Sequence, residues 1–404
     1  MGSGICTAHR GLRGGGGSLK ILDITEFYSE RGGGVKTYLH AKAQWLGKRP
    51  DVEHTMVVPG PRDTSQQIAT TTVHVVAGPK VPASPGYHFL TARRRVRRLV
   101  QSLAPDVIEV GSPFFANWLT RRGTRDAATK RVLFQHSDPL SVYVEHGLRR
   151  FPRALQRAAG WVLDRYLRSV YRSYAAIVAA TETAADSIRA LGLEPVLIPL
   201  GADTELFSPE RRDAAWRLEV GAEDGQPIGL YVGRLATEKR LDVVLDALHA
   251  LNRETGLLLV LIGEGHLRPI LEQRARARAH QLRVLPYIND RVALARAYAS
   301  ADFFVAPGPY ETFGMAAIEA MASGLPGVGV DHGSIGEKLR DAPWARTYRT
   351  EDSGDVVRAV TDLLATDMRE LGKQARAVAV ERYRLEATFE RLLELYREVA
   401  SKPE

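Results

Sequence analysis

Short apolar runs that end in a glycine or a polar turn recur along the whole chain, and helical periodicity follows many of them. Each run is rich in valine, isoleucine and leucine and is short enough to form one buried strand. Strands that alternate with helices build doubly wound sheets, so the pattern predicts an α/β protein. The runs cover residues 19–25, 54–60, 72–78, 106–113, 130–138, 175–181, 228–233, 257–265 and 301–307.

Length and composition limit the class of protein. With 404 residues, 45% of them hydrophobic and 25% charged, the chain is long enough for two globular domains. Its single cysteine, Cys6, excludes an internal disulfide framework and fits a reducing compartment. No apolar run approaches the length that crosses a bilayer. Residues 1–18 are glycine-rich and lack the apolar core of a secretory signal, so we expect a flexible tail there.

The net charge of +8 is unevenly distributed between the two halves. Residues 1–200 hold 28 Lys and Arg against 15 Asp and Glu, whereas residues 201–404 hold 27 against 32. We therefore expect the two halves of the chain to bind different kinds of partner. A basic first half suits nucleic acid, anionic lipid or an acidic acceptor.

Two basic stretches carry most of this asymmetry. Five arginines lie within Arg93–Arg98, and residues 151–174 alternate apolar residues such as Trp161 with arginines. Basic and aromatic residues on one helix suit an anionic membrane surface, and a core-facing helix with a solvated basic face is the alternative. No nucleic-acid-binding motif accompanies the charge, so we expect no nucleic acid partner.

The stretch Val305–Val330, VAPGPYETFGMAAIEAMASGLPGVGV, combines a strand, a turn and a short amphipathic helix. Glu311 lies in the turn and Glu319 about one and a half turns inside the helix, where the two carboxylates can accept hydrogen bonds from sugar hydroxyls. Two solvated glutamates around an ordinary turn are the alternative. Free backbone N–H groups of the first helical turn suit a phosphate. We expect Phe313, Gly314 and Met315 to form the start of that turn.

This stretch resembles the donor-site motif of the retaining glycosyltransferases of family 4 (glycosyl transferases group 1), which have the GT-B fold. The resemblance covers nearly the whole chain from Leu19. It implies that Glu311 contacts the transferred sugar and that Glu319 holds the ribose of the nucleotide. It also implies two Rossmann-like doubly wound domains facing across a cleft. We expect an acceptor-side domain over 19–200, a nucleotide-sugar-binding domain over 201–379, and a C-terminal helix at about 380–404 that packs back on the first domain.

A second block, PIGLYVGRLATEK, places two cations just beyond a strand. Arg234 and Lys239 can grip a diphosphate from two sides, and incidental charges on a surface turn are the alternative. The block resembles the family turn whose Arg and Lys neutralise the donor phosphates. Gly263, after the next strand, adds weak support for a phosphate-facing loop, and the resemblance implies that Ile288 lies where the nucleotide base is read.

The first half supplies a glycine-rich loop and a histidine. Gly33 and Gly34 permit close approach of the backbone to a ligand, although such glycines are often only a flexible turn. The resemblance implies contact with the donor diphosphate or acceptor. His136 ends a strand at the side where α/β sheets bind ligands, and a structural histidine is the alternative. The family carries a histidine over the transferred sugar here, so we assign His136 to the active site and Asp138 as a weaker candidate.

Together with these residues, the resemblance implies a glycosyltransferase that moves a hexose from a nucleotide-diphosphate sugar, of the GDP-mannose or UDP-glucose type, to a lipid or glycan hydroxyl in cell-envelope synthesis. Retention of configuration is implied by the family alone. No D-x-D stretch is present to hold a metal between phosphates, so we expect neither a metal nor another cofactor. We expect a cytoplasmic protein, peripheral on the inner membrane face. A GT-B-like sugar-nucleotide epimerase and a non-catalytic nucleotide-sugar or polyanion-binding protein are the alternatives.

Overall fold

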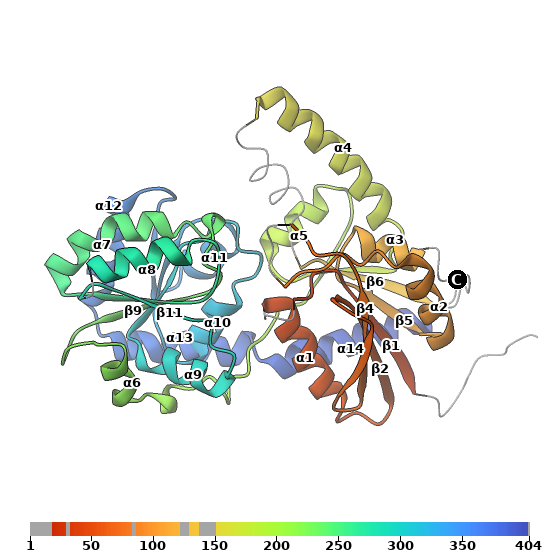
Figure 1. Ribbon diagram of the computed structural model, residues 1–404, viewed down its shortest axis with the longest axis horizontal. Helices are drawn as coiled ribbons and strands as arrows, with labels where there is room; N and C mark the ends of the chain where they lie inside the picture. Colours follow the sequence, from red (N-terminus) through yellow and green to blue (C-terminus); the bar gives the residue numbers. More distant parts are fainter. Residues whose placement is uncertain are drawn as a thin grey trace, which may run out of the picture.

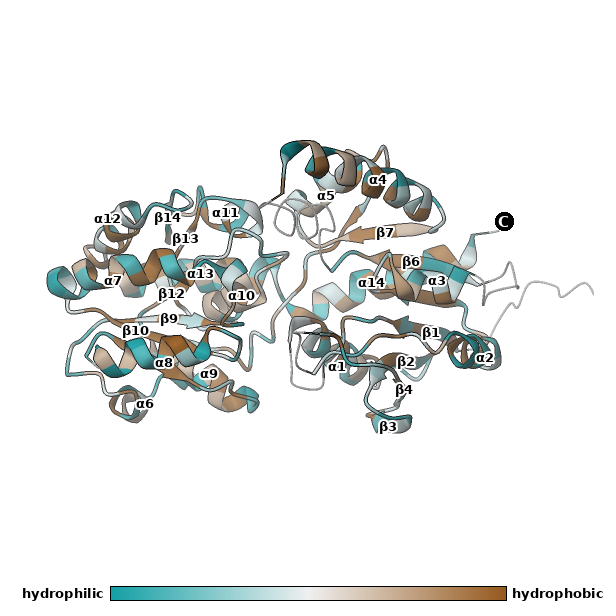
Figure 2. Ribbon diagram, turned by 45° about the horizontal axis from the view of Figure 1, so that its top comes forward, coloured by the Kyte–Doolittle hydropathy of each residue, from teal (hydrophilic) through white to brown (hydrophobic). Residues whose placement is uncertain are grey.

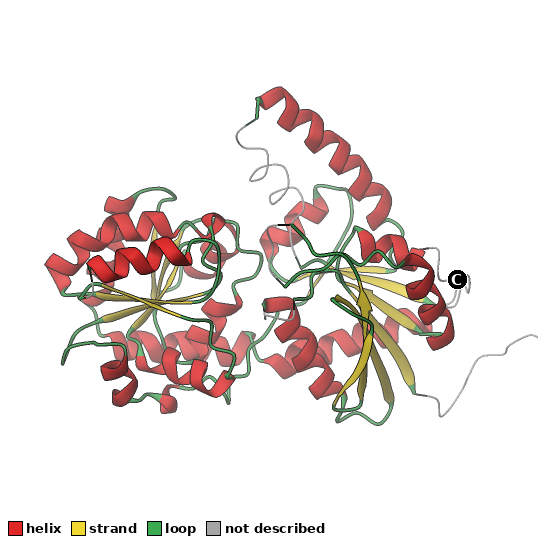
Figure 3. Ribbon diagram, in the orientation of Figure 1, coloured by secondary structure: helices red, strands yellow, loops and turns green. Residues whose placement is uncertain are grey.

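Two parallel sheets organise the chain, each with helices on both faces (Figures 1 and 3). The computed structural model describes residues 18–29, 33–82, 86–121, 129–136, 151–278 and 280–402. The expectation of a mixed α/β protein with two doubly wound domains is confirmed.

The first sheet has eight strands in the order β3-β4-β2-β1-β5-β6-β7-β8. Its strands are parallel except β3, which pairs antiparallel with β4 at one edge. Sequence periodicity did not predict β3, because four of its five residues are exposed and polar, and no apolar run marks it. The strands are β1 (Leu19–Ile24), β2 (Val52–Gly60), β3 (Thr64–Ile68), β4 (Thr71–Ala77), β5 (Val107–Val110), β6 (Lys130–Phe134), β7 (Ala176–Ala179) and β8 (Val196–Leu197).

Helices cover both faces of this sheet. On one face, α1 (Gly34–Leu46) and the C-terminal α14 (Leu385–Ser401) pack through residues such as Leu39 and Phe389. The opposite face carries a separate apolar core, to which Val96, Leu119 and Leu167 belong. The helices on that face are α2 (Arg93–Leu103), α3 (Phe115–Arg121), α4 (Arg153–Tyr171) and α5 (Glu182–Arg189).

The second sheet has six parallel strands in the order β11-β10-β9-β12-β13-β14. They are β9 (Ile228–Val232), β10 (Leu258–Ile262), β11 (Leu282–Leu285), β12 (Phe303–Ala306), β13 (Gly327–Val330) and β14 (Ala345–Tyr348). Helices α7 and α12 pair with each other, and α6, α9, α10 and α13 gather on the other side of the sheet in Figure 1. The helices are α6 (Ala214–Glu219), α7 (Leu241–Thr255), α8 (Arg268–Ala277), α9 (Arg291–Ser300), α10 (Met315–Ala322), α11 (Gly333–Leu339), α12 (Ser353–Leu364) and α13 (Met368–Arg382).

The chain crosses between the domains twice, and the two crossings hydrogen-bond to each other. The Ala202 N–H donates to the Tyr383 carbonyl at 2.9 Å, and the Leu385 N–H donates to the Ala202 carbonyl at 3.1 Å. The C-terminal segment is therefore two helices, α13 and α14, separated at Tyr383 and Arg384. The sequence had suggested one helix from about residue 380. After the break, α14 packs against the first sheet on the face that α1 also covers (Figure 1).

Helix α4 extends away from the first sheet over most of its length (Figure 1). Only its last turns are buried, through Leu167, Val170 and Tyr171. Its first half leaves Trp161 66% exposed and Val162 59% exposed. Within the described parts of the chain, no helix combines the length and the apolar character needed to cross a membrane.

Candidate active site

The residues predicted for the site follow the carboxyl ends of parallel strands in both domains. In the second sheet, β9 lies between β10 and β12, so the chain winds in opposite directions on the two sides of β9. Open α/β sheets bind ligands at such a reversal, outside the carboxyl ends of the strands. The predicted residues are Gly33 after β1, His136 after β6, Arg234 after β9, Gly263 after β10, Ile288 after β11 and Glu311 after β12.

Lys239 and Glu311 meet at this reversal. Lys239 ends the short 3₁₀ turn Thr237–Lys239 after β9, and its ammonium lies 2.5 Å from a Glu311 carboxylate oxygen. The carboxylate also accepts a hydrogen bond from the Gly314 backbone N–H. Burial raises the pKa of Glu311, but the Lys239 ammonium and the Gly314 N–H outweigh it and hold that pKa below its ordinary value. Glu311 is therefore ionised and held in place.

The start of α10 is built next to this pair. Gly314 caps the helix with φ 84°, in the left-handed region that glycine adopts most readily, and a Cβ there would lie 2.8 Å from the Ile335 side chain. Phe313 is buried and Met315 half-buried. Because the helix begins at Met315, its first N–H groups and the positive end of its dipole lie beside Glu311.

Helix α11 contributes two residues that the sequence analysis missed. The Ser334 hydroxyl donates to the Glu311 carbonyl at 2.6 Å, which fixes the backbone of the loop that carries Glu311. The Lys338 ammonium lies 4.3 Å from the centroid of the Phe313 ring. Burial lowers the pKa of Lys338 to about 8, against the opposing effect of Glu337 and Glu311. The available signal was the stretch GSIGEKL, which begins three residues after the end of strand β13.

Glu319 lies on the buried side of α10 and already has two protein partners. Its oxygens accept hydrogen bonds from Arg291 at 2.8 Å and from the Tyr298 hydroxyl at 3.2 Å. Burial raises the pKa of Glu319, and Arg291 only partly offsets this. Arg291 stacks over the Phe207 ring at 4.7 Å, so both sides of the ion pair are fixed. The carboxylate retains lone pairs for a ligand hydroxyl, because each oxygen accepts more than one hydrogen bond.

Other predicted residues in the second domain have different surroundings. Arg234 is 63% exposed and pairs with Glu238 at 2.8 Å, so its guanidinium faces solvent beside the site. A Cβ on Gly263 would lie 1.9 Å from the Gly233 carbonyl oxygen, so close packing of two turns accounts for this glycine. Ile288 is half-buried in the loop between β11 and α9.

In the first domain, His136 stacks on Phe134 at 4.5 Å between ring centroids and meets the edge of Tyr38 at 5.3 Å. Burial, with a smaller effect from the Lys42 ammonium, lowers the pKa of His136 to about 4, so the imidazole is neutral at physiological pH. Gly33 precedes α1, where Gly34 is exposed with open space around it. Asp138 lies outside the described residues.

A buried charge network lies below His136 and was not predicted. Lys42 is 1% exposed, and its ammonium contacts Asp23 at 2.8 Å, Glu109 at 3.0 Å and the Tyr396 hydroxyl at 2.9 Å. His54 contacts the other Asp23 oxygen at 3.0 Å. The network therefore joins α1, β1, β2 and β5 to the C-terminal helix α14. The available signal was a charged residue inside each of two apolar strands and a lysine on the apolar face of α1.

The described residues contain no group of three or more His, Cys, Asp and Glu side chains placed to hold a metal ion.

Solved structures of low sequence identity share this two-domain architecture. Sucrose-phosphate synthase from Thermosynechococcus elongatus matches 94% of this chain and 99% of its own, with a TM-score of 0.77 and 18% identity. Anabaena Alr3699/HepE in complex with UDP-glucose matches 94% of this chain and 100% of its own, with a TM-score of 0.70 and 17% identity. The fold is that of the GT-B glycosyltransferases.

Sequence comparison identifies the family. Residues 32–206 match the model of Glycosyltransferase Family 4, and residues 213–401 match that of Glycosyl transferases group 1. A GDP-mannose-dependent alpha-(1-6)-phosphatidylinositol dimannoside mannosyltransferase of Mycobacterium tuberculosis is 32% identical over 77% of this chain and 79% of its own length. A D-inositol 3-phosphate glycosyltransferase of Rhodococcus erythropolis is 32% identical over 55% of this chain and 54% of its own. The chain belongs to family 4 of the glycosyltransferases, and it is an enzyme that uses a nucleotide sugar.

Proposed function

We propose that this enzyme transfers a mannosyl group from GDP-mannose to a hydroxyl of a lipid-linked glycan, with retention of configuration and without a metal ion. The observation that carries the proposal is the Lys239–Glu311 pair beside the start of α10, at the reversal of the second sheet. GDP-mannose is favoured over UDP-glucose because several relatives, including the mycobacterial enzyme above, carry GDP-mannose in their names.

The chemistry assigned to the site follows from its charges. As the bond between the sugar C1 and the β-phosphate oxygen breaks, negative charge grows on the phosphate. Lys239, Arg234 and the first N–H groups of α10 stabilise that charge more in the transition state than in the ground state. The new bond joins C1 to the acceptor oxygen, and the acceptor proton passes to the departing phosphate. No separate protein base is therefore required.

The remaining residues orient the donor. Glu311 is ionised, so it accepts hydrogen bonds from sugar hydroxyls, and Glu319 binds the ribose while Arg291 and Tyr298 hold it. His136 lies over the sugar as a neutral imidazole, which can exchange hydrogen bonds with hydroxyls without adding a second positive charge. Gly33 and Gly34 have no side chains and so leave room for the acceptor next to the first domain.

The first experiment is a donor panel. Thermal shift and slow donor hydrolysis would be measured with UDP-, GDP- and ADP-sugars, with and without EDTA, on the wild type and Glu311→Gln. We expect GDP-mannose alone to stabilise the protein and to be hydrolysed, unchanged by EDTA, with hydrolysis lost in the variant. A different responding donor would overturn the GDP-mannose assignment, and loss of activity in EDTA would overturn metal independence. No response to any nucleotide sugar would overturn the assignment of the site.

A second proposal concerns where the enzyme works. We propose that the helical face of the first domain docks on an anionic membrane at the cytoplasmic side. Exposed apolar side chains of α3 and α4, among them Trp118 at 62% exposure and Trp161 at 66%, lie among exposed arginines. The ribbon of α4 in Figure 2 has both brown, hydrophobic and teal, hydrophilic segments. Aromatic and basic side chains together suit the interface of an anionic bilayer.

Helix α2 extends the same layer. Its exposed arginines border a hollow of about 650 Å³ between the β3–β4 hairpin and the helix, lined by Arg95, Arg98 and His74 among others. Arg95 is paired with Asp63 at the rim. Cations around an open hollow suit the phosphate of a lipid head group.

Vesicle flotation tests this docking. The variant Trp161→Ser with Arg153→Gln and Arg157→Gln should lose binding to phosphatidylglycerol vesicles but retain transfer to a soluble acceptor. The matched control is Arg274→Gln with Arg276→Gln, which removes two exposed cations from α8 of the other domain. Equal vesicle binding by both variants would contradict docking through α4.

A further inference from the structure

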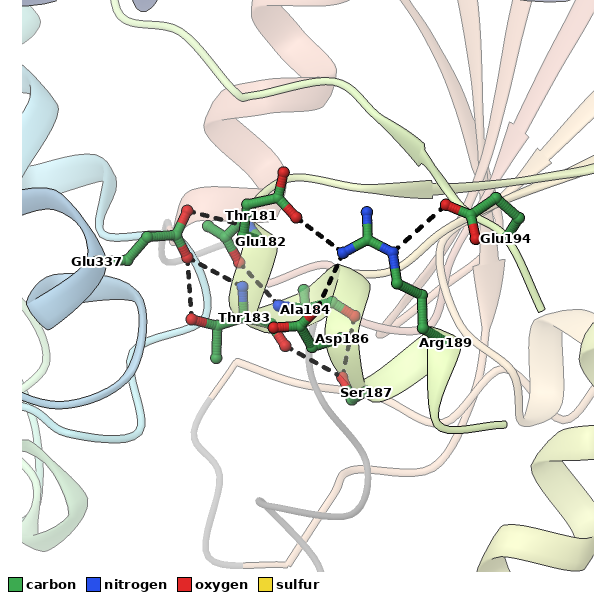
Figure 4. A network of polar contacts seen from close by, with 9 residues as sticks. All are labelled: Thr181, Glu182, Thr183, Ala184, Asp186, Ser187, Arg189, Glu194 and Glu337. Carbon is green, nitrogen blue, oxygen red and sulfur yellow. Dashed lines mark hydrogen bonds and ion pairs between the residues drawn. The ribbon is translucent and has the colours of Figure 1, made fainter. Parts of the chain in front are cut away.

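A carboxylate of the second domain holds the start of a helix in the first. Glu337 lies on α11, and one of its oxygens accepts the Glu182 backbone N–H at 3.0 Å. The other oxygen accepts the Thr183 backbone N–H at 3.0 Å and the Thr183 hydroxyl at 2.9 Å. Figure 4 shows Glu337 reaching the first turn of α5 from the neighbouring domain. Helices α11 and α5 also pack against each other.

The contact is not part of the normal capping of α5. Thr181 already caps that helix, since its hydroxyl accepts the Ala184 N–H at 3.1 Å. The acidic residue of the first turn, Glu182, points its own carboxylate at Arg189, at 2.9 Å. Glu337 therefore takes two backbone N–H groups that α5 itself leaves without a side-chain acceptor, at the positive end of the helix dipole. The carboxylate adds an interdomain interaction that α5 does not need for its own folding.

The same short helix also contacts the donor loop and the interdomain crossing. Ser334 holds the Glu311 carbonyl at 2.6 Å, one turn before Glu337. The next residue, Lys338, lies 4.3 Å from the Phe313 ring and 6.0 Å from the ring of Tyr383, where α13 ends and the chain returns to the first domain. Helix α11, which has only two turns, thus contacts the loop at Glu311, the interdomain crossing at Tyr383 and helix α5 of the first domain. Because α11 is one short helix, a movement at any of these contacts also moves the side chains that make the other two.

We propose that Glu337 is a positioning residue that clasps the two domains together, so that occupation of the donor site and closure of the acceptor domain are coupled through α11. The proposal rests on the proposed function, because it takes the loop at Glu311 as the donor site. The second domain makes most of the proposed donor contacts, with His136 of the first domain over the sugar, whereas α5 belongs to the domain that presents the acceptor. The clasp therefore contributes to transfer more than to donor binding, and by thermodynamic linkage donor binding strengthens the clasp.

Glu337→Gln and Thr183→Val remove the clasp in steps. The amide loses the charge that both N–H groups face, whereas valine removes only the hydroxyl donor. The matched control is Glu194→Gln, since Glu194 is an exposed carboxylate near α5 that pairs with Arg189 at 3.3 Å inside the first domain. Each variant would be measured for GDP-mannose affinity by calorimetry, for kcat and acceptor KM, and for radius of gyration by X-ray scattering with and without donor.

For Glu337→Gln we expect a larger radius of gyration, a kcat about tenfold lower and a donor Kd about threefold higher than that of the wild type. The amide keeps one acceptor oxygen but no charge for the three hydrogen bonds of this exposed contact, and by linkage a weaker clasp lowers the donor affinity. Thr183→Val should show the same pattern with a smaller change, and combining the two should add little to Glu337→Gln. Glu194→Gln should match the wild type. Added donor should shrink the radius of gyration of the wild type more than that of Glu337→Gln.

The outcomes separate the clasp from the proposed function. If the wild type binds donor and Glu337→Gln equals Glu194→Gln in kcat and radius of gyration, the clasp is wrong while the donor site stands. A larger radius of gyration with unchanged kcat would show a contact that does not position the reaction, which also overturns the proposal. If no nucleotide sugar binds the wild type, the proposed function fails first.

Discussion

At the scale of single residues, one ion pair determines the chemistry assigned to the site. Lys239 and Glu311 come from the turns after two adjacent strands and are 15% and 31% exposed, so their interaction is only partly screened by water. The pair keeps the carboxylate ionised and the ammonium aimed at the start of α10. A diphosphate bound at the start of α10 would share the Lys239 ammonium with Glu311. In the proposed complex, Lys239 would therefore contact the phosphate end of the donor while its partner Glu311 contacts the sugar end.

Replacing Lys239 should remove the interaction that connects the phosphate and the sugar of the donor. We expect Lys239→Met to lower kcat/KM by about 100-fold, because a charge that stabilises the leaving phosphate is lost. It should also raise the pKa of Glu311, since the largest effect opposing burial is removed. Steady-state kinetics with GDP-mannose would measure the first effect. Lys373→Met, which removes a 76% exposed lysine from α13, should leave kcat/KM unchanged.

His136 gives a prediction in pH. Its pKa is about 4 in the folded protein against an ordinary 6.5, so below pH 6.5 the unfolded chain binds a proton that the folded protein does not. The free energy of unfolding should therefore fall as the pH drops from about 6.5 to 4. Asp23, with a pKa of about 2 where 3.8 is ordinary, acts only below this window. Urea unfolding of wild type and His136→Gln at pH 4.5 and 7 tests this, and an equal loss in both would contradict it.

At the scale of elements, α14 connects the two domains through its side chains as well as its backbone. The Tyr396 hydroxyl donates to Glu109 and contacts Lys42 in the network below the first sheet. Burial makes this network costly to break, because removing Lys42 leaves two carboxylates without their cation. The C-terminal helix α14 is thus part of the core of the first domain, although it follows the second domain in sequence.

Substitutions along this network should separate buried from exposed contacts. We expect Lys42→Met to lower the free energy of unfolding by about 3–5 kcal/mol and Tyr396→Phe by about 1–2 kcal/mol. Arg397→Gln, next along α14, breaks only an exposed pair with Asp51 and should cost less than about 1 kcal/mol. Chemical denaturation measures all three. A Lys42→Met cost as small as that of Arg397→Gln would show that the network adds nothing to stability.

The same elements show what the sequence predicts and what it does not. Apolar runs ending in turns placed most strands of both sheets, because buried parallel strands need continuous apolar residues. The edge strand β3 was missed, since its exposed side chains leave no such run. Lys239 and Glu311 were predicted as site residues because each lies in a local motif, and the structure brings their side chains together. The contacts of Lys42 and Glu337 join residues far apart in sequence, at 354 residues for Lys42 and Tyr396, and no local pattern predicts such partners.

At the scale of the whole molecule, charge divides the enzyme into two parts. The first 200 residues carry the excess of arginine and lysine, and the second domain, in which we propose the donor site, carries a slight excess of acid. The arrangement suits an enzyme whose first domain meets an anionic surface while the second binds a soluble donor. The expected helix at 151–174 is present as α4, and its docking role remains a prediction.

Salt should weaken docking without affecting the chemistry. Raising the ionic strength from about 0.05 M to 0.5 M shortens the screening length severalfold, so binding to anionic vesicles should fall steeply. Transfer to a soluble acceptor should change little, because Lys239 and Glu311 are largely shielded. Parallel flotation and transfer assays measure both quantities. Vesicle binding that does not change with salt would contradict an electrostatic contribution from the first domain.

The proposed mechanism is tested most directly by following the reaction of GDP-mannose with a mannosylated lipid acceptor by nuclear magnetic resonance, in the wild type and in Glu311→Gln. The mechanism assigned to the Lys239–Glu311 site predicts a product with the same α configuration as the donor, formed in the presence of EDTA and lost or greatly slowed in the variant. A β-linked product, or full activity of Glu311→Gln, would contradict the mechanism assigned to the Lys239–Glu311 site.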